Sequence, residues 1–309
     1  MRIVFMGTPA FAVPSLTALL DNGHEVLAAI TQPDRPSGRG NKLTACPVKE
    51  AALSRGVKVL QFERLRKQEG LDALRALAPE LCVTAAFGQI LSPKLLAVPK
   101  LGTVNVHASL LPAYRGAAPI NWCLINGETV TGVTTMMTDP GIDTGDILLQ
   151  RALPIAPDET AGALTERLAH LGAELLVETL RRMAAGDCPR MPQDHALATH
   201  QPMLEKTHGR IDWAKSAPET ANLVRGVNPW PGAYTTLADG SMLKIWRARA
   251  TEGEGIPGQV LTSDSKLVIA CGSGALDVLE LQAPGAKRMD AAAYLRGRKV
   301  QILEREIQS

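Results

Sequence analysis

The chain has 309 residues, of which 45% are hydrophobic and 21% charged, and its formal net charge is +2. This composition is ordinary for a globular, water-soluble protein, and the length favours two domains. It excludes a helical membrane protein, because no apolar run approaches the roughly 18 residues that a membrane-spanning helix needs. The first residues already have the apolar pattern of a buried strand, which leaves no room for a signal peptide. We therefore expect a cytoplasmic protein.

The first half of the chain alternates short apolar runs with helical patterns. Strands are predicted at residues 2–6, 25–30, 57–60, 81–86 and 102–106, with helices at 11–20, 46–55 and 64–77 between them. Further strands at 130–137 and 147–153 and a long helix at 160–185 follow. Strands separated by helices indicate a parallel, Rossmann-like α/β sheet, which binds ligands at the carboxyl ends of its strands.

The helical and strand patterns stop in residues 187–205, which are rich in proline and polar residues. We expect a linker there, between an N-terminal domain of residues 1–186 and a C-terminal domain of residues 206–309. Short strands are predicted in the C-terminal domain at 232–237, 241–248, 258–262, 266–270 and 276–282. Five short strands are typical of a small β-barrel, such as one with an oligonucleotide-binding (OB) fold.

The five cysteines give no sign of a metal site. None are close enough in sequence to form a CxxC pair, and no cysteine and histidine cluster has zinc spacing. We therefore expect reduced thiols and no bound metal, with a structural disulfide as the less favoured alternative. These cysteines are Cys46, Cys82, Cys123, Cys188 and Cys271.

The end of the predicted strand at 102–106 carries an amide and an imidazole. Asn105 and His107 are two residues apart, so they lie on the same face of an extended strand. An amide can donate a hydrogen bond to a developing oxyanion, and an imidazole can transfer a proton near neutral pH. Asp143, in a loop rich in glycine and proline, can orient such an imidazole. The spacing alone leaves open the alternative that His107 is a strand-end histidine bonded to the backbone.

Ser109–Pro112 (SLLP) follows directly. Pro112 fixes its own backbone and favours an extended Leu111. Such a segment can present main-chain groups and leucines to a flat heterocycle, although an ordinary exit loop has the same pattern.

Three segments of this half of the chain, Asn105–Pro119, Gly127–Thr134 and Gly141–Asp146, resemble the folate-dependent formyltransferase family. The resemblance implies that Asn105, His107 and Asp143 are the catalytic residues. It also implies that tetrahydrofolate is bound by the SLLP segment and by a loop on the pterin side, in which many members have tyrosine where this chain has phenylalanine. The implied folate-binding residues are Ser109, Leu110, Leu111, Pro112, Phe87, Gly88, Gln89, Ile90 and Leu91.

Four further segments, Gly7–Ala12, Thr31–Gly40, Arg210–Trp213 and Asn228–Gly232, resemble the branch of the family that formylates methionyl-tRNA. The resemblance implies transfer of the formyl group of 10-formyltetrahydrofolate, a co-substrate, to the amino group of initiator methionyl-tRNA, for translation initiation. We expect the protein to work as a monomer and without a membrane.

Three other functions share part of this pattern. A formyltransferase for a sugar-nucleotide amine shares the catalytic residues, but the basic segment Thr31–Gly40 and the form of Gly141–Asp146 argue against it. Glycinamide ribonucleotide formyltransferases usually lack a C-terminal domain of this size. An RNA-binding protein with an inactive formyltransferase-like domain would not need the intact set of Asn105, His107 and Asp143.

Basic residues indicate where RNA would bind. Residues 206–309 carry 14 Lys and Arg against 11 Asp and Glu, a net charge of +3, which permits a polyanionic partner. Guanidinium and ammonium groups contact phosphates, although each of these residues can also be an ordinary solvated charge. The candidate tRNA-binding residues are Arg35, Arg39 and Lys42 in the N-terminal loop and Lys287, Arg288, Arg296, Arg298 and Lys299 near the C-terminus.

Overall fold

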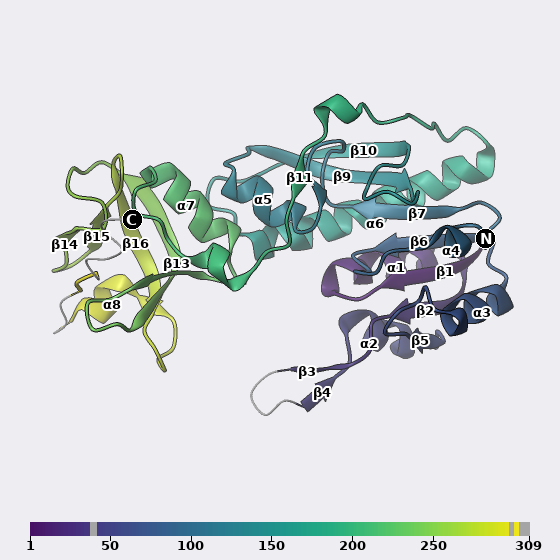
Figure 1. Ribbon diagram of the computed structural model, residues 1–309, viewed down its shortest axis with the longest axis horizontal. Coiled ribbons are helices and arrows are strands. Elements are labelled where there is room, and N and C mark those ends of the chain that lie inside the picture. The colour runs from purple at the N-terminus through teal and green to yellow at the C-terminus, as the bar shows by residue number, and fades with distance from the viewer. Residues whose placement is uncertain (38–41, 297–299, 303–309) are drawn as a thin grey trace. The chain divides into compact units, whose positions relative to one another are not determined.

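Figure 1 shows the computed structural model of the chain, which describes residues 1–37, 42–296 and 300–302. These residues form two compact units. The first unit consists of residues 1–116, 130–154 and 165–200, and the second of residues 117–129, 155–164 and 201–309. The sequence predicted one linker between the two domains, at residues 187–205. In the structure, the contacts of residues 117–129 and 155–164 also group these two earlier segments with the second unit.

The first unit is built on a seven-stranded sheet with the order β10-β9-β7-β6-β1-β2-β5. Its strands are β1 (Arg2–Gly7), β2 (Glu25–Thr31), β5 (Val59–Gln61), β6 (Leu81–Ala85), β7 (Thr103–His107), β9 (Val130–Met137) and β10 (Ile147–Pro154). The first five are mutually parallel, and β9 runs antiparallel to both β7 and β10. The predicted parallel α/β sheet is therefore confirmed, and each predicted strand lies within two residues of an observed one.

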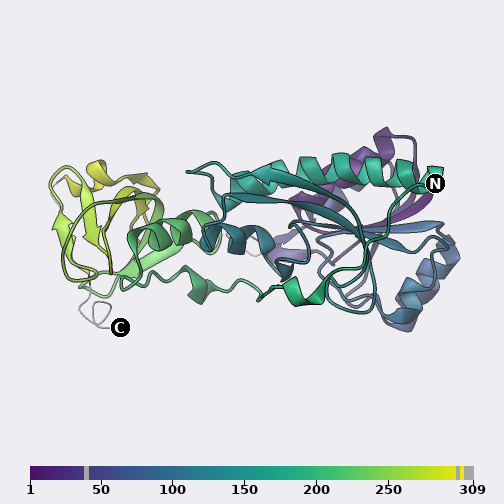
Figure 2. The same ribbon diagram turned by 90° about the horizontal axis from the view of Figure 1, so that it is seen from above.

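Helices cover both faces of this sheet. In Figure 2, α1 (Val13–Asp21) lies beside α6 (Ala161–Ala185) on one face, and α3 (Gln68–Leu77) lies on the other. On the α6 face, a Cβ at Gly172 would come within 2.8 Å of Val106 Cγ1, so glycine allows α6 to approach β7 closely. On the α3 face, leucines of α3 pack with Val4 and Met6 of β1.

The connecting segments of the chain hold short elements. They are η1 (Ala10–Ala12), β3 (Arg35–Ser37), β4 (Lys42–Thr44), α2 (Pro47–Ser54), α4 (Pro93–Leu96), β8 (Arg115–Gly116), α5 (Pro119–Ile125), η2 (His195–Leu197), β11 (His200–Gln201) and η3 (Lys206–Gly209).

The second unit contains a curled antiparallel sheet with the order β12-β13-β16-β15-β14, with β17 paired to β16. Its elements are α7 (Ala217–Gly226), β12 (Ala233–Thr236), β13 (Met242–Thr251), β14 (Val260–Thr262), β15 (Leu267–Ala270), β16 (Ala275–Gln282), β17 (Met289–Asp290) and α8 (Ala291–Leu295). All five predicted strands are present. The core includes a fully buried Trp213, whose indole nitrogen donates a 3.0 Å hydrogen bond to Thr235 Oγ1.

The strand order places the ligand-binding end of the sheet. After β1 the chain moves outward to β2 and β5, and then returns to form β6 on the other side of β1. The topological switch point therefore lies between β1 and β6, and the loops that follow these strands flank the crevice where open α/β sheets bind ligands. Within the described ranges, none of the helices is both long enough and apolar enough to cross a membrane.

Candidate active site

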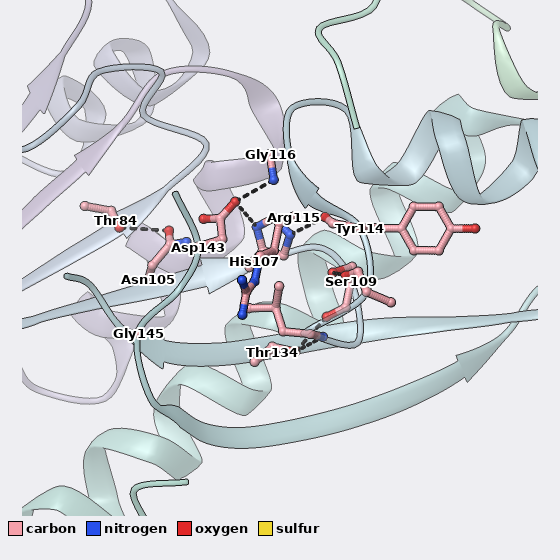
Figure 3. Close-up of polar contacts among 12 residues, drawn as sticks. Thr84, Asn105, His107, Ser109, Tyr114, Arg115, Gly116, Thr134, Asp143 and Gly145 are labelled. Atoms are coloured by element: carbon pink, nitrogen blue, oxygen red, sulfur yellow. Dashed lines mark hydrogen bonds and ion pairs between the residues drawn. The ribbon is translucent and has the colours of Figure 1, made fainter. Parts of the chain in front are cut away.

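The candidate site begins on β7, on the face of the sheet opposite α6. Asn105 pairs in register with Thr84 on the adjacent β6, and the Thr84 hydroxyl donates a 2.8 Å hydrogen bond to Asn105 Oδ1. This bond fixes the orientation of the amide: Oδ1 faces Thr84, and the amide nitrogen is directed away from it. Figure 3 shows the side chains of Asn105, His107 and Asp143 gathered at this end of the strand.

His107, the last residue of β7, is 7% exposed and contacts groups on both ring nitrogens. Nε2 lies 3.0 Å from the carbonyl oxygen of Tyr114. Because a carbonyl oxygen only accepts, Nε2 carries a proton. Nδ1 lies 3.6 Å from Asp143 Oδ2, which is close enough for an ion pair but longer than a hydrogen bond. The backbone bond that the sequence left open as an alternative is therefore present together with the contact to Asp143.

Asp143 lies in the loop between β9 and β10 and has a φ of 52°, in the left-handed region that aspartate tolerates better than most residues. Its carboxylate Oδ2 accepts a 2.8 Å hydrogen bond from the Gly116 N–H. A Cβ at Gly145, two residues later, would overlap the carbonyl oxygen of Met137, so the tight path of this loop requires glycine there. The loop conformation brings the carboxylate to the imidazole.

The SLLP segment is held from within the first unit. Thr134 Oγ1 donates to Ser109 O at 2.7 Å and accepts from Leu111 N at 3.1 Å. The amide nitrogen of Gln150 donates to Leu111 O at 2.8 Å. The Leu111 side chain is 3% exposed and packs in the core with Met136 and Ile147. Of the four residues, Leu110 and Pro112 keep partly exposed surface, whereas Ser109 and Leu111 hold the segment in place.

The loop after β6 is anchored at the switch point. The Phe87 carbonyl oxygen accepts hydrogen bonds from Gln32 Nε2 at 3.1 Å and from Thr8 Oγ1 at 3.4 Å. The Gln89 side chain bonds two backbone groups of residues 62–65. Phe87 and Leu91 are buried, Gly88 is exposed and has a φ of 75°, and Ile90 is 67% exposed. At the carboxyl end of the sheet, this loop therefore exposes the apolar side chain of Ile90 and the backbone of Gly88.

The cysteines are free thiols, and Cys82 is buried in the same core cluster as Phe87 and Leu91. Burial raises the pKa of the Cys82 thiol from its ordinary value to about 12, although a hydrogen bond with Thr103 opposes this shift. The described part of the chain holds no group of three or more histidine, cysteine or acidic residues arranged to bind a metal ion.

Of the predicted tRNA-binding residues in the N-terminal loop, only Arg35 has a described side chain. It is exposed, and its guanidinium lies 3.4 Å from Glu63 Oε2. Lys42 belongs to β4, which pairs with β3, and its side chain is not among those described. Arg39 lies outside the described residues.

In the second unit, Lys287, Arg288 and Arg296 are exposed. The guanidinium carbon of Arg288 lies 3.5 Å from the centroid of the Trp246 ring, so this arginine stacks on an aromatic face of its own chain. Arg298 and Lys299 lie outside the described residues.

Sequence reasoning missed three side chains that support the site. Thr84 was interpreted only as part of a buried strand, and period-two alternation against Asn105 on the next strand is a signal that could have found it. The other two are Arg115 and Gln193, which bond to each other, and Gln193 also bonds to the loop that carries Asp143. They are 78 residues apart in sequence, and Gln193 lies in the segment that was predicted to be a linker. No local pattern indicated that Gln193 would be buried.

The chain matches the models of two known domain families, which together cover most of its length. The model of the formyl transferase family matches residues 1–180, and the model of the formyl transferase C-terminal domain matches residues 203–299. The chain belongs to the formyl transferase family. The expected fold, a Rossmann-like sheet followed by a small β domain, agrees with this membership.

The chain is similar over nearly its whole length to curated members of the family. It is 53% identical to the methionyl-tRNA formyltransferase of Geotalea uraniireducens over 97% of this chain and 96% of that one. It is also 49% identical to the methionyl-tRNA formyltransferase of Ruminiclostridium cellulolyticum over 99% of both chains.

Solved structures share the fold at lower identity. HypX from Aquifex aeolicus, in complex with tetrahydrofolic acid, is 19% identical with a TM-score of 0.63; the match covers 96% of this chain and 47% of HypX, so this chain spans about half of that protein. The N-formyltransferase of Helicobacter canadensis, in complex with folinic acid and dTDP-3-aminofucose, is also 19% identical. That match has a TM-score of 0.67 and covers 94% of this chain and 100% of the other.

Proposed function

We propose that this protein transfers the formyl group of 10-formyltetrahydrofolate to the free amino group of initiator methionyl-tRNA, giving N-formylmethionyl-tRNA for translation initiation. The observation that carries the proposal is the grouping of Asn105, His107 and Asp143 at the carboxyl end of β7. The chain that holds this group is about half identical, over nearly its full length, to proteins named methionyl-tRNA formyltransferase.

The reaction needs an oxyanion to be stabilised and a proton to be moved. The amino nitrogen attacks the formyl carbon, a carbon–nitrogen bond forms, and the formyl oxygen gains negative charge. The bond from this carbon to N10 of the folate then breaks, N10 takes up a proton, and the attacking nitrogen loses one. Electrons and protons therefore balance without an oxidant or a metal.

Asn105 supplies an oriented donor in this mechanism. Because Thr84 engages Oδ1, the amide N–H₂ end is oriented before substrate binds, and no bond must break to orient it during the reaction. An oxyanion donor of this kind contributes about 10²–10³ in rate.

His107 and Asp143 manage charge and protons. With the Nε2 proton directed to Tyr114 O, a second proton on Nδ1 makes an imidazolium that faces the Asp143 carboxylate. This cation stabilises the developing oxyanion beside Asn105, while Asp143 holds the ring and accepts the amine proton through water. These roles resemble those of a catalytic imidazole and the carboxylate that orients it in other acyl-transfer enzymes.

The folate donor fits the two anchored loops at this end of the sheet. Ile90 and Gly88 offer an apolar side chain and accessible backbone, and Leu110 and Pro112 offer partly exposed apolar surface. A pterin ring needs an apolar surface for its faces and backbone groups for its polar edge, and these residues provide both. The two loops are held in shape by the remaining residues, which are Phe87, Gln89 and Leu91 in the first loop and Ser109 and Leu111 in the second.

The tRNA would be bound mainly through its phosphates. Residues 1–186 carry out catalysis in this proposal, and residues 206–309, with their net charge of +3, bind the nucleic acid. The basic loop that contains Arg35, Arg39 and Lys42 contacts the acceptor end, and Lys287, Arg288, Arg296, Arg298 and Lys299 contact the stem. The protein acts as a cytoplasmic monomer.

A direct assay tests the proposal. The purified protein is incubated with 10-formyltetrahydrofolate and one of three acceptors: charged initiator methionyl-tRNA, the same tRNA uncharged, or a dTDP-linked amino sugar. We expect formylation of the charged tRNA alone. Formylation of the amino sugar without that of the tRNA would overturn the assignment of the acceptor, and no formylation of any amine would overturn the reaction.

A further inference from the structure

Gln193, in the segment predicted to be a linker, bonds the loop that carries Asp143. It is 6% exposed, and its amide nitrogen donates to Asp143 O at 2.9 Å and to Gly145 O at 2.7 Å. The loop thus has both carbonyls around its turn engaged by one side chain from a distant segment. We propose that Gln193, held by the buried Arg115, is a positioning residue that sets Asp143 against His107; the inference rests on the proposed function.

Arg115 holds the other end of the Gln193 amide. Its side chain is 2% exposed, and Nε and Nη2 donate to Gln193 Oε1 at 3.0 and 2.6 Å. Nη1 lies 3.1 Å from His195 Nδ1. Among the described residues, the hydrogen bonds of this buried guanidinium go to the uncharged amide of Gln193 and to a ring nitrogen of His195. Burying a charge beside neutral partners is costly, so the arrangement calls for a reason other than stability.

The charge of Arg115 strengthens what Gln193 does. Charge-assisted hydrogen bonds to Oε1 polarise the amide, and the polarised N–H₂ group is a better donor to the two loop carbonyls. The support matters for Asp143, because a φ of 52° still costs free energy for a residue other than glycine, even for aspartate.

The backbone on either side of Arg115 touches both reacting side chains. The residue before it, Tyr114, places its carbonyl oxygen 3.0 Å from His107 Nε2. The residue after it, Gly116, donates its N–H to Asp143 Oδ2 at 2.8 Å. The Arg115–Gln193 pair therefore fixes Asp143 through its backbone from one side and through its carboxylate from the other. The distance between His107 and Asp143 follows from this frame.

A nearly isosteric substitution tests the role of Gln193. Gln193→Met keeps the volume and removes both ends of the amide, and Gln193→Glu keeps an acceptor for Arg115 but loses the donor to the loop. We expect each to lower kcat for methionyl-tRNA about 10- to 100-fold, since small misplacements of reacting groups cost rates of this order. The KM for the folate donor should change less than about threefold. Asp194→Ala is the matched control, because it removes an exposed backbone bond one residue away and should leave kcat unchanged.

A double-mutant cycle separates positioning from folding. Asp143→Asn keeps the side-chain size and tolerates a positive φ, but removes the charge. If Gln193 acts through Asp143, Gln193→Met should cost less than about threefold in the Asp143→Asn background. Native-state hydrogen exchange provides a second readout, because Gln193→Met should speed exchange at the Gly116 amide while strand amides of β6 and β7 stay protected.

The outcomes are distinguishable. If Asp143→Asn lowers kcat but Gln193→Met and Gln193→Glu do not, the positioning role is wrong and the proposed function stands. If Gln193→Met costs the same factor in both backgrounds and leaves Gly116 exchange unchanged, Gln193 only stabilises the fold. If Asp143→Asn itself has no effect on kcat, both the inference and the proposed role of Asp143 are overturned.

Discussion

The hydrogen bond between Thr84 and Asn105 allows catalysis and stability to be separated in one experiment. Asn105→Ala removes the proposed oxyanion donor and should lower kcat by about 10²–10³, equivalent to about 2.7–4 kcal/mol of transition-state stabilisation. The same change leaves the hydroxyl of Thr84, which is 6% exposed, without its acceptor. An unpaired buried polar group costs about 1–3 kcal/mol of folding free energy. Asn105→Ala alone therefore lowers both quantities.

Adding Thr84→Val separates them. Valine has nearly the shape of threonine and needs no partner, so the double variant has no orphaned hydroxyl. We expect the free energy of unfolding, measured by urea denaturation, to recover by about 1 kcal/mol or more in the double variant. Turnover of methionyl-tRNA, measured with saturating folate donor, should stay as low as in Asn105→Ala.

Thr84→Val by itself is the informative single variant. It keeps the donor but frees the amide to rotate, so we expect a loss of kcat of less than about tenfold, well below that of Asn105→Ala. Turnover within tenfold of wild type in a folded Asn105→Ala protein would refute the oxyanion role. Recovery of turnover in the double variant would show that Asn105→Ala acts through stability.

Three further predictions concern the folate, the tRNA and the buried thiol. A non-hydrolysable folate analogue should protect amides in residues 87–91 and 109–112 from hydrogen exchange, and protection confined to residues 206–309 would contradict this placement. Arg39→Ala should lower formylation of charged tRNA far more than it lowers hydrolysis of the folate donor without tRNA. Lys287→Glu should flatten the salt dependence of tRNA binding, because each phosphate contact contributes to that slope. Unchanged tRNA formylation in the first variant and an unchanged salt slope in the second would contradict these contacts. Because the pKa of Cys82 is raised to about 12, its thiol should resist alkylation at pH 9 in the native protein, and its stabilising contribution should be lost as the pH rises from about 9 towards 12; rapid native-state alkylation would contradict the burial.

The central strands β1 and β6 could be predicted because each is a short apolar run that is buried on both faces. The sequence of β6, LCVTA, has no polar face, which is typical of a parallel strand between two helical layers. That Asn105 and His107 lie on one face of a strand could be predicted because alternation along a strand is a local property. Assigning a role to Asp143 needed the family resemblance, since nothing local reports that a loop 36 residues after His107 returns to it.

What could not be predicted depends on contacts between distant segments. Gln193 is polar and lies among prolines, so by composition it belongs to an exposed connection, yet the structure buries it between Arg115 and the Asp143 loop. The burial of Leu111 had no local signal either, because it depends on Met136 and Ile147 of other strands. In both cases the tertiary partners decide the environment of the residue.

The close approach of α6 to β7 at Gly172 has a consequence for protein engineering. Val106, which α6 contacts, lies between Asn105 and His107 in sequence and points to the opposite face of the sheet. A bulky side chain at Gly172 would press on the strand from behind and tilt both polar residues without touching either. Libraries that seek new amine acceptors should therefore leave this rear contact unchanged and vary the loops in front, where side chains can be exchanged without shifting β7.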